Sequence, residues 1–559
     1  MKFFAFEKNV LNIYPQLVRI YILLILGIIV PYGILLLRLP IIFLQIFAVI
    51  WLLIILKDII SYIRKTIPQH IPIIIGMIGF LTIGFSFYFK LDRDYAAYIS
   101  NAYYLIQNGG FFAEAIYPDR LLSIVNGVYT PSFLIGYSLY LAVFVSILGN
   151  WGLIVANSIA LIIGFICIEQ LYRLVTKTDK SPRLLSILIL ANPVIYWLYI
   201  YTYSEALFLP IIWGAIMSFI LGLQSKHIGL VFLAFWGIII SFMVRVEGLG
   251  LIFTFGTALV AACILIPSHW KQKTVYSAIS IVVLIGILGG TLIVSGEYVS
   301  EQFFKVSRTV DITDKENTIS DAKERFQLLL LSFGTYLVMI PLLWSIANRK
   351  LYTNKYVYWI LFLLLPFAIY LYNPNITRDF PWLLRRYITA IIPLILLFGT
   401  WGVTHIYKGK KYISTIIIGI YILAQILFIG LLIRERVDQR PYYYELSQFF
   451  ASQELPKDTI VYMRGDLDRV NELTRVIPYL SVSQNEIIFQ STYLDEVFKT
   501  GGYLVDTVAY PEDDTRLQRI DSFTSTIETF RGQKESRFYR TSKAKQEITI
   551  YLYKIIATE

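Results

Sequence analysis

The sequence predicts a multi-spanning α-helical membrane protein that ends in a small α/β domain outside the membrane. Of its 559 residues, 57% are hydrophobic and only 16% are charged, which excludes an ordinary soluble protein. The mean hydropathy of +0.64 supports the same class. Long apolar runs recur through about the first 435 residues and then stop, so the predicted membrane part ends there.

The apolar runs are long enough to cross a bilayer. Crossing about 30 Å of hydrocarbon takes roughly 20 apolar helical residues, and about thirteen such spans can be placed. They cover approximately residues 16–37, 40–56, 71–90, 151–174, 183–201, 205–223, 228–244, 248–267, 274–294, 326–346, 356–372, 387–406 and 412–434. The first run lacks a small-residue cleavage pattern, so we expect a retained helix rather than a signal peptide.

The segment 132–148 decides the topology. It is apolar but is interrupted by Gly136, Tyr137, Ser138 and Tyr140. If it lies along the membrane instead of crossing it, the short basic loops all fall on one side, which the positive-inside rule assigns to the cytoplasm. If it crosses, the later basic loops fall outside. The sequence therefore favours a juxtamembrane helix at the outer surface.

This topology places four segments on the extracytoplasmic side of the plasma (inner) membrane: about 91–131, 295–325, 373–386 and everything from about 436. Nucleotide-activated substrates are normally absent there, so a substrate must arrive in the membrane or from outside. The net charge is +11, but the basic residues lie mostly in short loops, which indicates topology and argues against nucleic-acid binding.

The tail from Arg436 is predicted to be a separate α/β domain. Its expected strands are 458–463, 486–490, 502–508 and 547–555, and its expected helices are about 443–453, 491–499 and 514–530. About 120 residues suffice for a core of its own. The tail carries no catalytic motif, so we interpret it as a lid or docking platform beside the site.

Two carboxylates, Asp92 and Asp94, follow the third apolar run directly, together with Arg93 and Tyr98. Acidic groups make a poor lipid anchor, so this polar stretch is a candidate reaction site. Either aspartate could instead only cap the helix that follows, since Asp is a favoured N-cap residue. The pair Gly109-Gly110 is expected to end that helix.

Five short motifs follow one another along the chain. They are Asp94, Tyr98, Ala102, Leu105 and Gly109-Gly110; Thr130-Pro131 with Gly136-Tyr137 and Leu139; Asn192-Pro193 with Ser204-Glu205; Arg245-Val246-Glu247-Gly248; and Arg386-Tyr387 with Pro393. In this order they resemble the GT-C superfamily, the multispanning glycosyltransferases that take sugars from polyprenyl phosphates. The likeness is greatest to the branch of protein O-mannosyltransferases and lipid A aminoarabinose transferases.

The resemblance implies three parts: two additional N-terminal transmembrane helices in 1–70, a GT-C-like catalytic module in 71–434, and a soluble extracytoplasmic domain in 435–559. The module would contain the loop 91–131 and the juxtamembrane helix 132–148. Two departures stand out. Family members often have Asp-Glu where Tyr95 follows Asp94 here, and their "RPEG" motif lacks its proline in this chain.

Glycosyl transfer to a hydroxyl needs a base that takes the acceptor proton, and Asp94 is our candidate, with Asp92 as a second catalytic or substrate-binding acid. In-line attack would invert the anomeric configuration. A lipid phosphate is already a good leaving group, so the site mainly needs cations that hold developing negative charge. Arg385 and Arg386 are the first phosphate candidates, because the guanidinium fork matches phosphate, and Arg378 and Arg245 are weaker ones.

The other substrate-binding candidates are Tyr98, Glu205, Arg245 and Glu247, each with a structural alternative. Glu205 lies at a helix N-terminus, where a carboxylate is favoured anyway. Arg245 and Glu247 fit a structural ion pair as well as they fit substrate contact. Likewise, Arg385 and Arg386 could be interface anchors.

No cofactor is clearly implied. The four histidines map to the cytoplasmic side, so a divalent cation at the outer site would depend on Asp92 and Asp94. Cys167 and Cys263 both lie in apolar runs and offer no disulfide framework.

The predicted function is transfer of a hexosyl or pentosyl group from an undecaprenyl or dolichyl phosphate to an extracytoplasmic lipid, glycan or protein acceptor, within membrane lipids. One alternative is an O-antigen-type polymerase or ligase, against which the early Asp motif and the late soluble tail argue. Another is a non-enzymatic lipid-linked sugar transporter or flippase. Transporters usually show paired halves and acids in mid-helix, whereas these acids gather at outer helix ends.

Overall fold

The computed structural model describes most of the chain. The described residues are 2–66, 93–111, 113–114, 122–125, 128–131, 133–149, 151–177, 203–267, 270–308, 352–368, 389–406, 460–464, 486–490, 501–511, 514–532 and 541–556, with single positions or short stretches between 185 and 199 and between 412 and 455.

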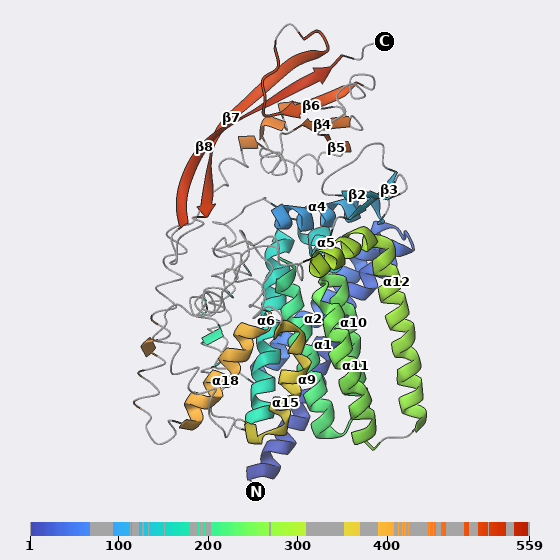
Figure 1. Cartoon of the computed structure of the whole chain (residues 1–559), viewed down its shortest axis with the longest axis vertical. Helices are drawn as coiled ribbons and strands as arrows, with labels where there is room; N and C mark the ends of the chain where they lie inside the picture. Colours follow the sequence, from blue (N-terminus) through green and yellow to red (C-terminus); the bar gives the residue numbers. More distant parts are fainter. Residues whose placement is uncertain are drawn as a thin grey trace.

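A bundle of apolar helices forms the larger part of the molecule (Figure 1). The helices are α1 (Lys2–Leu36), α2 (Ile41–Thr66), α5 (Gly136–Leu148), α6 (Trp151–Thr176), α9 (Ser204–Ser225), α10 (Ile228–Val244), α11 (Glu247–Leu265), α12 (Trp270–Arg308), α15 (Lys355–Leu363) and α18 (Ile391–Ile406), with a 3-10 turn at Leu365–Ala368. Within the described residues, six helices are long and apolar enough to cross a membrane. The predicted class, a multi-pass membrane protein, is confirmed.

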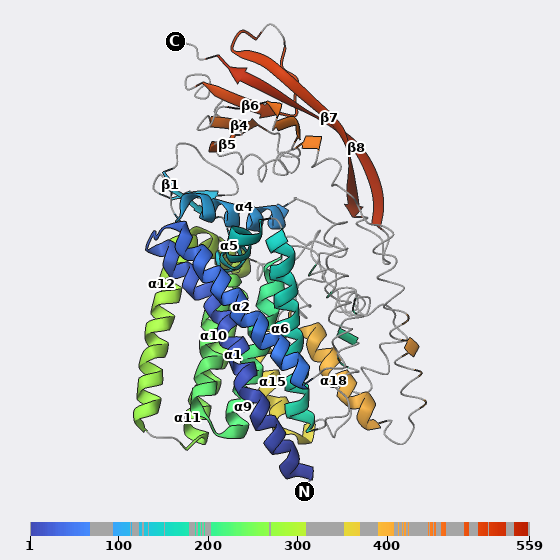
Figure 2. The ribbon, with the colours of Figure 1, turned by 180° about the vertical axis from the view of Figure 1, so that it is seen from behind.

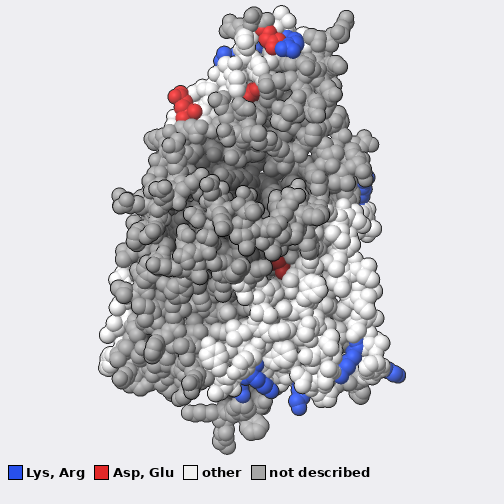
Figure 3. All heavy atoms as spheres, viewed as in Figure 1, with Lys and Arg blue, Asp and Glu red and all other residues white. Residues whose placement is uncertain are grey.

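Not every predicted span can be compared with the structure. Residues 71–90 and 326–346 lie outside the described residues, as do most of 183–201 and 412–434. The count of about thirteen spans therefore stays a prediction. Among the described residues on the face shown in Figure 3, basic side chains gather at the end of the bundle far from α4 (Arg93–Asn108).

The helix α12 corrects one predicted boundary. We expected a span at 274–294 followed by a loop at 295–325, but α12 continues to Arg308 through a kink at Ser295 (φ −135°, ψ 27°). The Ser295 hydroxyl donates to the Phe133 carbonyl at 3.1 Å. After Gly296 the sequence turns polar without a glycine or proline up to Arg308. The drop in hydropathy after Gly296 predicted a loop, but the structure has a helix there.

The helix α1 packs into the bundle through a tyrosine that fills space left by glycines. A Cβ added at Gly214 of α9 or at Gly237 of α10 would collide with the Tyr21 ring. The Tyr21 hydroxyl donates to the Ile211 carbonyl at 3.0 Å, so the buried phenol is satisfied. The helix α2 packs against α1 through Trp51, which lies against Gly27, and against α5, where the Trp51 ring contacts Tyr140 and Phe144 with centroids 6.3 and 5.4 Å away.

The segment 91–131, expected as an outward loop, contains a helix and a small sheet. The helix α4 lies across one end of the bundle (Figure 1) and is followed by Gly109 with φ +59°. The Gly109 amide donates to the Leu105 carbonyl at 3.1 Å, so the predicted glycine stop is confirmed. Strands β1 (Ala113–Glu114), β2 (Leu122–Val125) and β3 (Val128–Pro131) then form an antiparallel sheet in the order β1-β3-β2.

The predicted juxtamembrane segment contains α5, a helix of 13 residues. At about 1.5 Å per residue it is about 20 Å long, short of a hydrocarbon core of about 30 Å. Residues Gly136 to Val145 are all buried, and α5 contacts α1, α2, α4, α6 and α10. Its location at the outer surface stays a prediction.

The C-terminal domain is built on a five-stranded sheet in the order β5-β4-β6-β8-β7. Its strands are β4 (Ile460–Arg464), β5 (Glu486–Gln490), β6 (Gly502–Asp506), β7 (Leu517–Gly532) and β8 (Thr541–Ile555). The first three are parallel, and β8 and β7 continue the sheet antiparallel. The predicted small C-terminal domain with a sheet is confirmed.

The expected helix at 514–530 is wrong, because this segment forms the long strand β7. The stretch is rich in residues that favour strands, such as Phe523, Thr524 and Ile527. It pairs with β8 from Leu517↔Ile555 to Gly532↔Thr541. The two strands form a curved ribbon whose hairpin end reaches the level of α4 (Figure 2).

Candidate active site

The start of α9 brings a serine and a glutamate into the interior. Ser204 and Glu205 are its first residues, and they are 0% and 1% exposed. Pro210 has no amide hydrogen, so it cannot donate to the Ala206 carbonyl one turn earlier. The Tyr199 hydroxyl donates to that carbonyl instead, at 3.1 Å. The Ala206 carbonyl therefore has a hydrogen-bond donor although it is fully buried.

The turn between α10 and α11 brings an arginine and a second glutamate to the same place. Arg245 follows α10 in extended backbone (φ −151°, ψ 143°), and Glu247 begins α11. A Cβ at Gly248 would come within 2.6 Å of the Phe242 nitrogen, so glycine allows α11 to start against α10. Val246 is the residue before α11, and its carbonyl accepts from the Leu249 amide at 3.0 Å, so every residue of this motif has a defined part in the turn.

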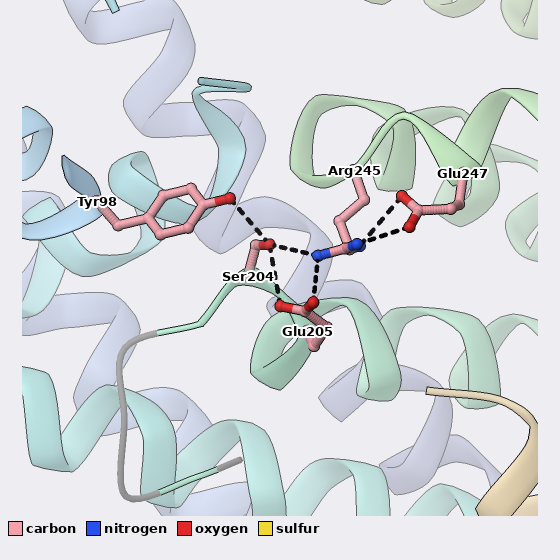
Figure 4. Close-up of polar contacts among 5 residues, drawn as sticks. All are labelled: Tyr98, Ser204, Glu205, Arg245 and Glu247. Atoms are coloured by element: carbon pink, nitrogen blue, oxygen red, sulfur yellow. Dashed lines mark hydrogen bonds and ion pairs between the residues drawn. The ribbon is translucent and has the colours of Figure 1, made fainter. Parts of the chain in front are cut away.

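Arg245 forms ion pairs with both glutamates (Figure 4). Its Nη1 lies 2.7 Å from Glu205 Oε1. Its Nη2 and Nε donate to Glu247 at 2.6 and 3.1 Å, a bidentate contact. The side chains of Arg245, Glu205 and Glu247 are only 8%, 1% and 10% exposed. Buried charges are tolerated when they are paired in this way.

The hydroxyl of Ser204 links this charged cluster to α4. Its Oγ accepts from Arg245 Nη1 at 3.0 Å and from the Tyr98 hydroxyl at 3.1 Å (Figure 4). Tyr98 is 5% exposed, and its ring packs against Phe133 and Tyr137 with centroids 5.3 and 5.2 Å away. The result is one polar network that joins α4, α9 and the α10–α11 turn.

Asp94 lies in the first turn of α4, because that helix begins at Arg93. The buried side of α4 carries Tyr98, Ala102 and Leu105. Residues four apart share a helix face, so the position of Asp94 continues this face by one turn. The structure thus brings Tyr98, Glu205, Arg245 and Glu247 together, whereas Asp92, Arg378, Arg385 and Arg386 lie outside the described residues.

Sequence reasoning did not single out Ser204 or Tyr137 as site residues. The Tyr137 hydroxyl donates to Asn157 Oδ1 at 2.9 Å, and a Cβ at the preceding Gly136 would come 2.7 Å from the Met243 carbonyl oxygen. Ser204 and Tyr137 both belong to the motifs named in the sequence analysis. That membership was the one sequence signal that they lie near the site. What they bond to required the fold.

Within the described part of the chain, no three His, Cys, Asp or Glu side chains are grouped so that they could hold a metal ion. Glu205 and Glu247 share Arg245 as their counter-charge. A divalent cation at Asp92 and Asp94 stays a prediction.

Comparison with known proteins places the fold. The chain has an ArnT-like membrane fold, so the predicted multi-spanning helical fold is confirmed. Two crystal structures of ArnT from Cupriavidus metallidurans match, one in the apo state and one bound to undecaprenyl phosphate. Their TM-scores are 0.53 and 0.52 at 9% and 10% identity, and each match covers 87% of this chain and 98% of that chain. No protein-family model and no curated protein sequence matches the chain.

Proposed function

We propose that this chain is a membrane glycosyltransferase that moves a sugar from a polyprenyl phosphate to an extracytoplasmic acceptor. The observation that carries the proposal is the meeting of separate motifs at one end of the bundle. Three motifs that are far apart in sequence contribute Tyr98, Ser204 with Glu205, and Arg245 with Glu247, whose side chains form one buried hydrogen-bonded network. The ArnT-like fold supports the class, and one ArnT structure holds undecaprenyl phosphate.

In the proposed reaction, Asp94 takes the proton of an acceptor hydroxyl. The acceptor oxygen attacks the anomeric carbon from the face opposite the phosphate, and the bond between that carbon and the phosphate oxygen breaks. The electron pair leaves with the phosphate, so the products are an inverted glycoside and a free polyprenyl phosphate. Arg385 and Arg386, with Arg378 as weaker support, hold the phosphate as its charge develops.

The Arg245 cluster has a supporting part in this proposal. Glu205 and Glu247 present carboxylate oxygens that accept hydrogen bonds from sugar hydroxyls, and Arg245 holds both carboxylates in place. Because the cluster is almost fully buried, its groups are oriented before the substrate arrives. Tyr98 connects this cluster to α4, and the position of Asp94 lies one turn earlier on the same face of that helix.

The side of the membrane is also part of the proposal. Basic side chains gather at the bundle end far from α4 (Figure 3), which supports a cytoplasmic location for that end and an extracytoplasmic one for the site. Single cysteines introduced at Ser132 and Leu148 can be labelled with an impermeant reagent from either side. We expect both positions to react from outside. Labelling of the two from opposite sides would overturn the juxtamembrane assignment of 132–148.

Lipid-linked sugar profiling by mass spectrometry tests the proposed activity in cells. A strain lacking this protein should accumulate a polyprenyl-phosphate sugar and lose a single-sugar modification. Loss of a glycan polymer would favour the polymerase or ligase alternative instead. A donor that accumulates only on the cytoplasmic side would favour the transporter. The purified wild-type protein in lipid nanodiscs should then transfer the identified sugar, and absence of any transfer would contradict the proposal.

A further inference from the structure

The hydroxyl of Ser204 has all its hydrogen-bonding capacity directed at named partners. A serine hydroxyl has one hydrogen and two lone pairs. Tyr98 and Arg245 donate to Ser204 Oγ at 3.1 and 3.0 Å. The remaining hydrogen points to Glu205 Oε2 at 3.4 Å. Ser204 is 0% exposed, so bulk water cannot replace these partners.

Through these hydrogen bonds Ser204 connects the Arg245 cluster to α4. On one side of Ser204 lies the Arg245 ion-pair cluster, and on the other lies the Tyr98 hydroxyl on α4. The position of Asp94 is one turn from Tyr98 along the same helix face, a rise of about 6 Å. Holding Tyr98 therefore also limits how α4 can rotate or slide at Asp94.

We propose that Ser204 is a positioning residue: its hydroxyl holds α4, and with it Asp94, in register with the Arg245 cluster. The proposal rests on the proposed function, in which Asp94 is the base. The ring contacts of Tyr98 with Phe133 and Tyr137 hold the apolar part of the side chain, but they do not fix the direction of its hydroxyl. The bond to Ser204 does. A base displaced by about 1 Å lowers a rate roughly 100-fold.

Ser204→Ala removes the shared acceptor and leaves both Arg245 ion pairs in place. We expect kcat to fall about 10- to 100-fold while the KM for the donor stays unchanged, because the base is misplaced and the donor contacts are not. Tyr98→Phe should have the same effect from the other end of the bond. If Ser204 acts through Tyr98, the double variant should be no slower than either single variant.

Ser218→Ala is the matched control. Ser218 lies in the same helix and is also 0% exposed, and its hydroxyl has no hydrogen-bond partner within the described structure. This variant should keep the wild-type kcat. If Ser204→Ala does not fold, Tyr98→Phe still tests the bond, because it leaves the whole of the Arg245 cluster untouched.

Hydrogen exchange of the α4 amides adds a readout that does not need activity. Exchange in α4 should be faster in Ser204→Ala and Tyr98→Phe than in wild type and Ser218→Ala, all as full-length protein in nanodiscs. Unchanged α4 exchange, an unchanged kcat in Ser204→Ala, or rate losses that multiply in the double variant would each overturn the positioning role. If wild type transfers no sugar at all, the proposed function fails, and the exchange data then decide the positioning of α4 alone.

Discussion

Two buried arginines in this bundle both form ion pairs with glutamates, but one pairs within a single helix and the other joins two helices. Arg173 binds Glu169 at 2.7 Å, four residues earlier in α6, with side chains 15% and 1% exposed. Arg245 is buried to a similar degree but binds Glu205 of α9 and Glu247 of α11. The first pair follows from helix geometry alone. The second exists only when two helices and a turn are correctly placed.

The two pairs also lie at opposite ends of the bundle. Gln224 near the end of α9 donates to the Leu174 carbonyl of α6 at 3.0 Å, so the Glu169–Arg173 pair lies near the last turn of α9. Glu205 lies in its first turn, and a helix of 22 residues is about 33 Å long. A buried ion pair does not by itself indicate a functional site. The connection to several motif-bearing elements is what distinguishes Arg245.

The largest expected effect comes from removing each arginine's charge. Arg245→Gln removes the counter-charge that two buried carboxylates share and should destabilise the protein by about 3–5 kcal/mol, with loss of transfer. Arg173→Gln removes a counter-charge from one carboxylate and should destabilise the protein less, while the folded fraction keeps its kcat. Thermal unfolding in detergent and transfer per folded molecule measure the two effects. Equal loss of kcat in both variants would remove the distinction between the pairs.

Replacing each arginine by lysine keeps the positive charge but removes the planar guanidinium group, so it separates the effect of geometry from that of charge. Arg245→Lys cannot make the bidentate contact with Glu247 and also reach Ser204, so we expect transfer to fall about 10- to 100-fold with little change in Tm. In Arg173→Lys both quantities should stay near wild type. Initial rates at saturating donor give the comparison. A fully active Arg245→Lys would show that charge alone suffices there.

An uncharged contact between helices, that of Tyr21 with Gly237, adds a third site to this comparison. In Gly237→Ala the new methyl group collides with the Tyr21 hydroxyl, so we expect destabilisation of about 1–3 kcal/mol with kcat of the folded enzyme unchanged. Adding Tyr21→Phe removes the colliding oxygen and should restore part of the stability. Urea or thermal unfolding of the single and double variants measures this. No recovery in the double variant would mean that the hydroxyl is not the group that collides.

The smallest effect is expected at a partly exposed ion pair in the C-terminal domain. Hydrogen bonds from the Arg516 side chain lower the pKa of Asp514 below its ordinary value, and Arg516 Nε lies 2.9 Å from Asp514 Oδ1. Because the folded pKa is the lower one, the stabilisation is present above the unfolded pKa of about 3.9 and is lost as pH falls through the folded value. Solvent screening keeps it below about 1 kcal/mol. Acid unfolding of Asp514→Asn should therefore show a slightly weaker pH dependence than wild type.

Much of the membrane part could be predicted from local sequence. Apolar length predicts helices, and the Gly109 stop and the Arg245–Glu247 pair depend on residues close in sequence. The remaining features depend on distant partners. Strand-favouring residues in β7 were a local signal, but its length of 16 residues depends on pairing with β8, and the bond between Tyr98 and Ser204 joins residues 106 positions apart. Hydropathy also cannot show that α12 continues past Ser295.

Release of polyprenyl phosphate in a single turnover tests the central claim most directly. Wild type and Asp94→Asn would each be mixed with the lipid-linked donor and acceptor in nanodiscs. Asp58→Asn makes the same chemical change at the Arg19–Asp58 pair between α1 and α2, where the N–O distance is 3.0 Å, and serves as the control. We predict release and transfer in wild type and Asp58→Asn and neither in a folded Asp94→Asn. Transfer by Asp94→Asn at the wild-type rate would contradict the account.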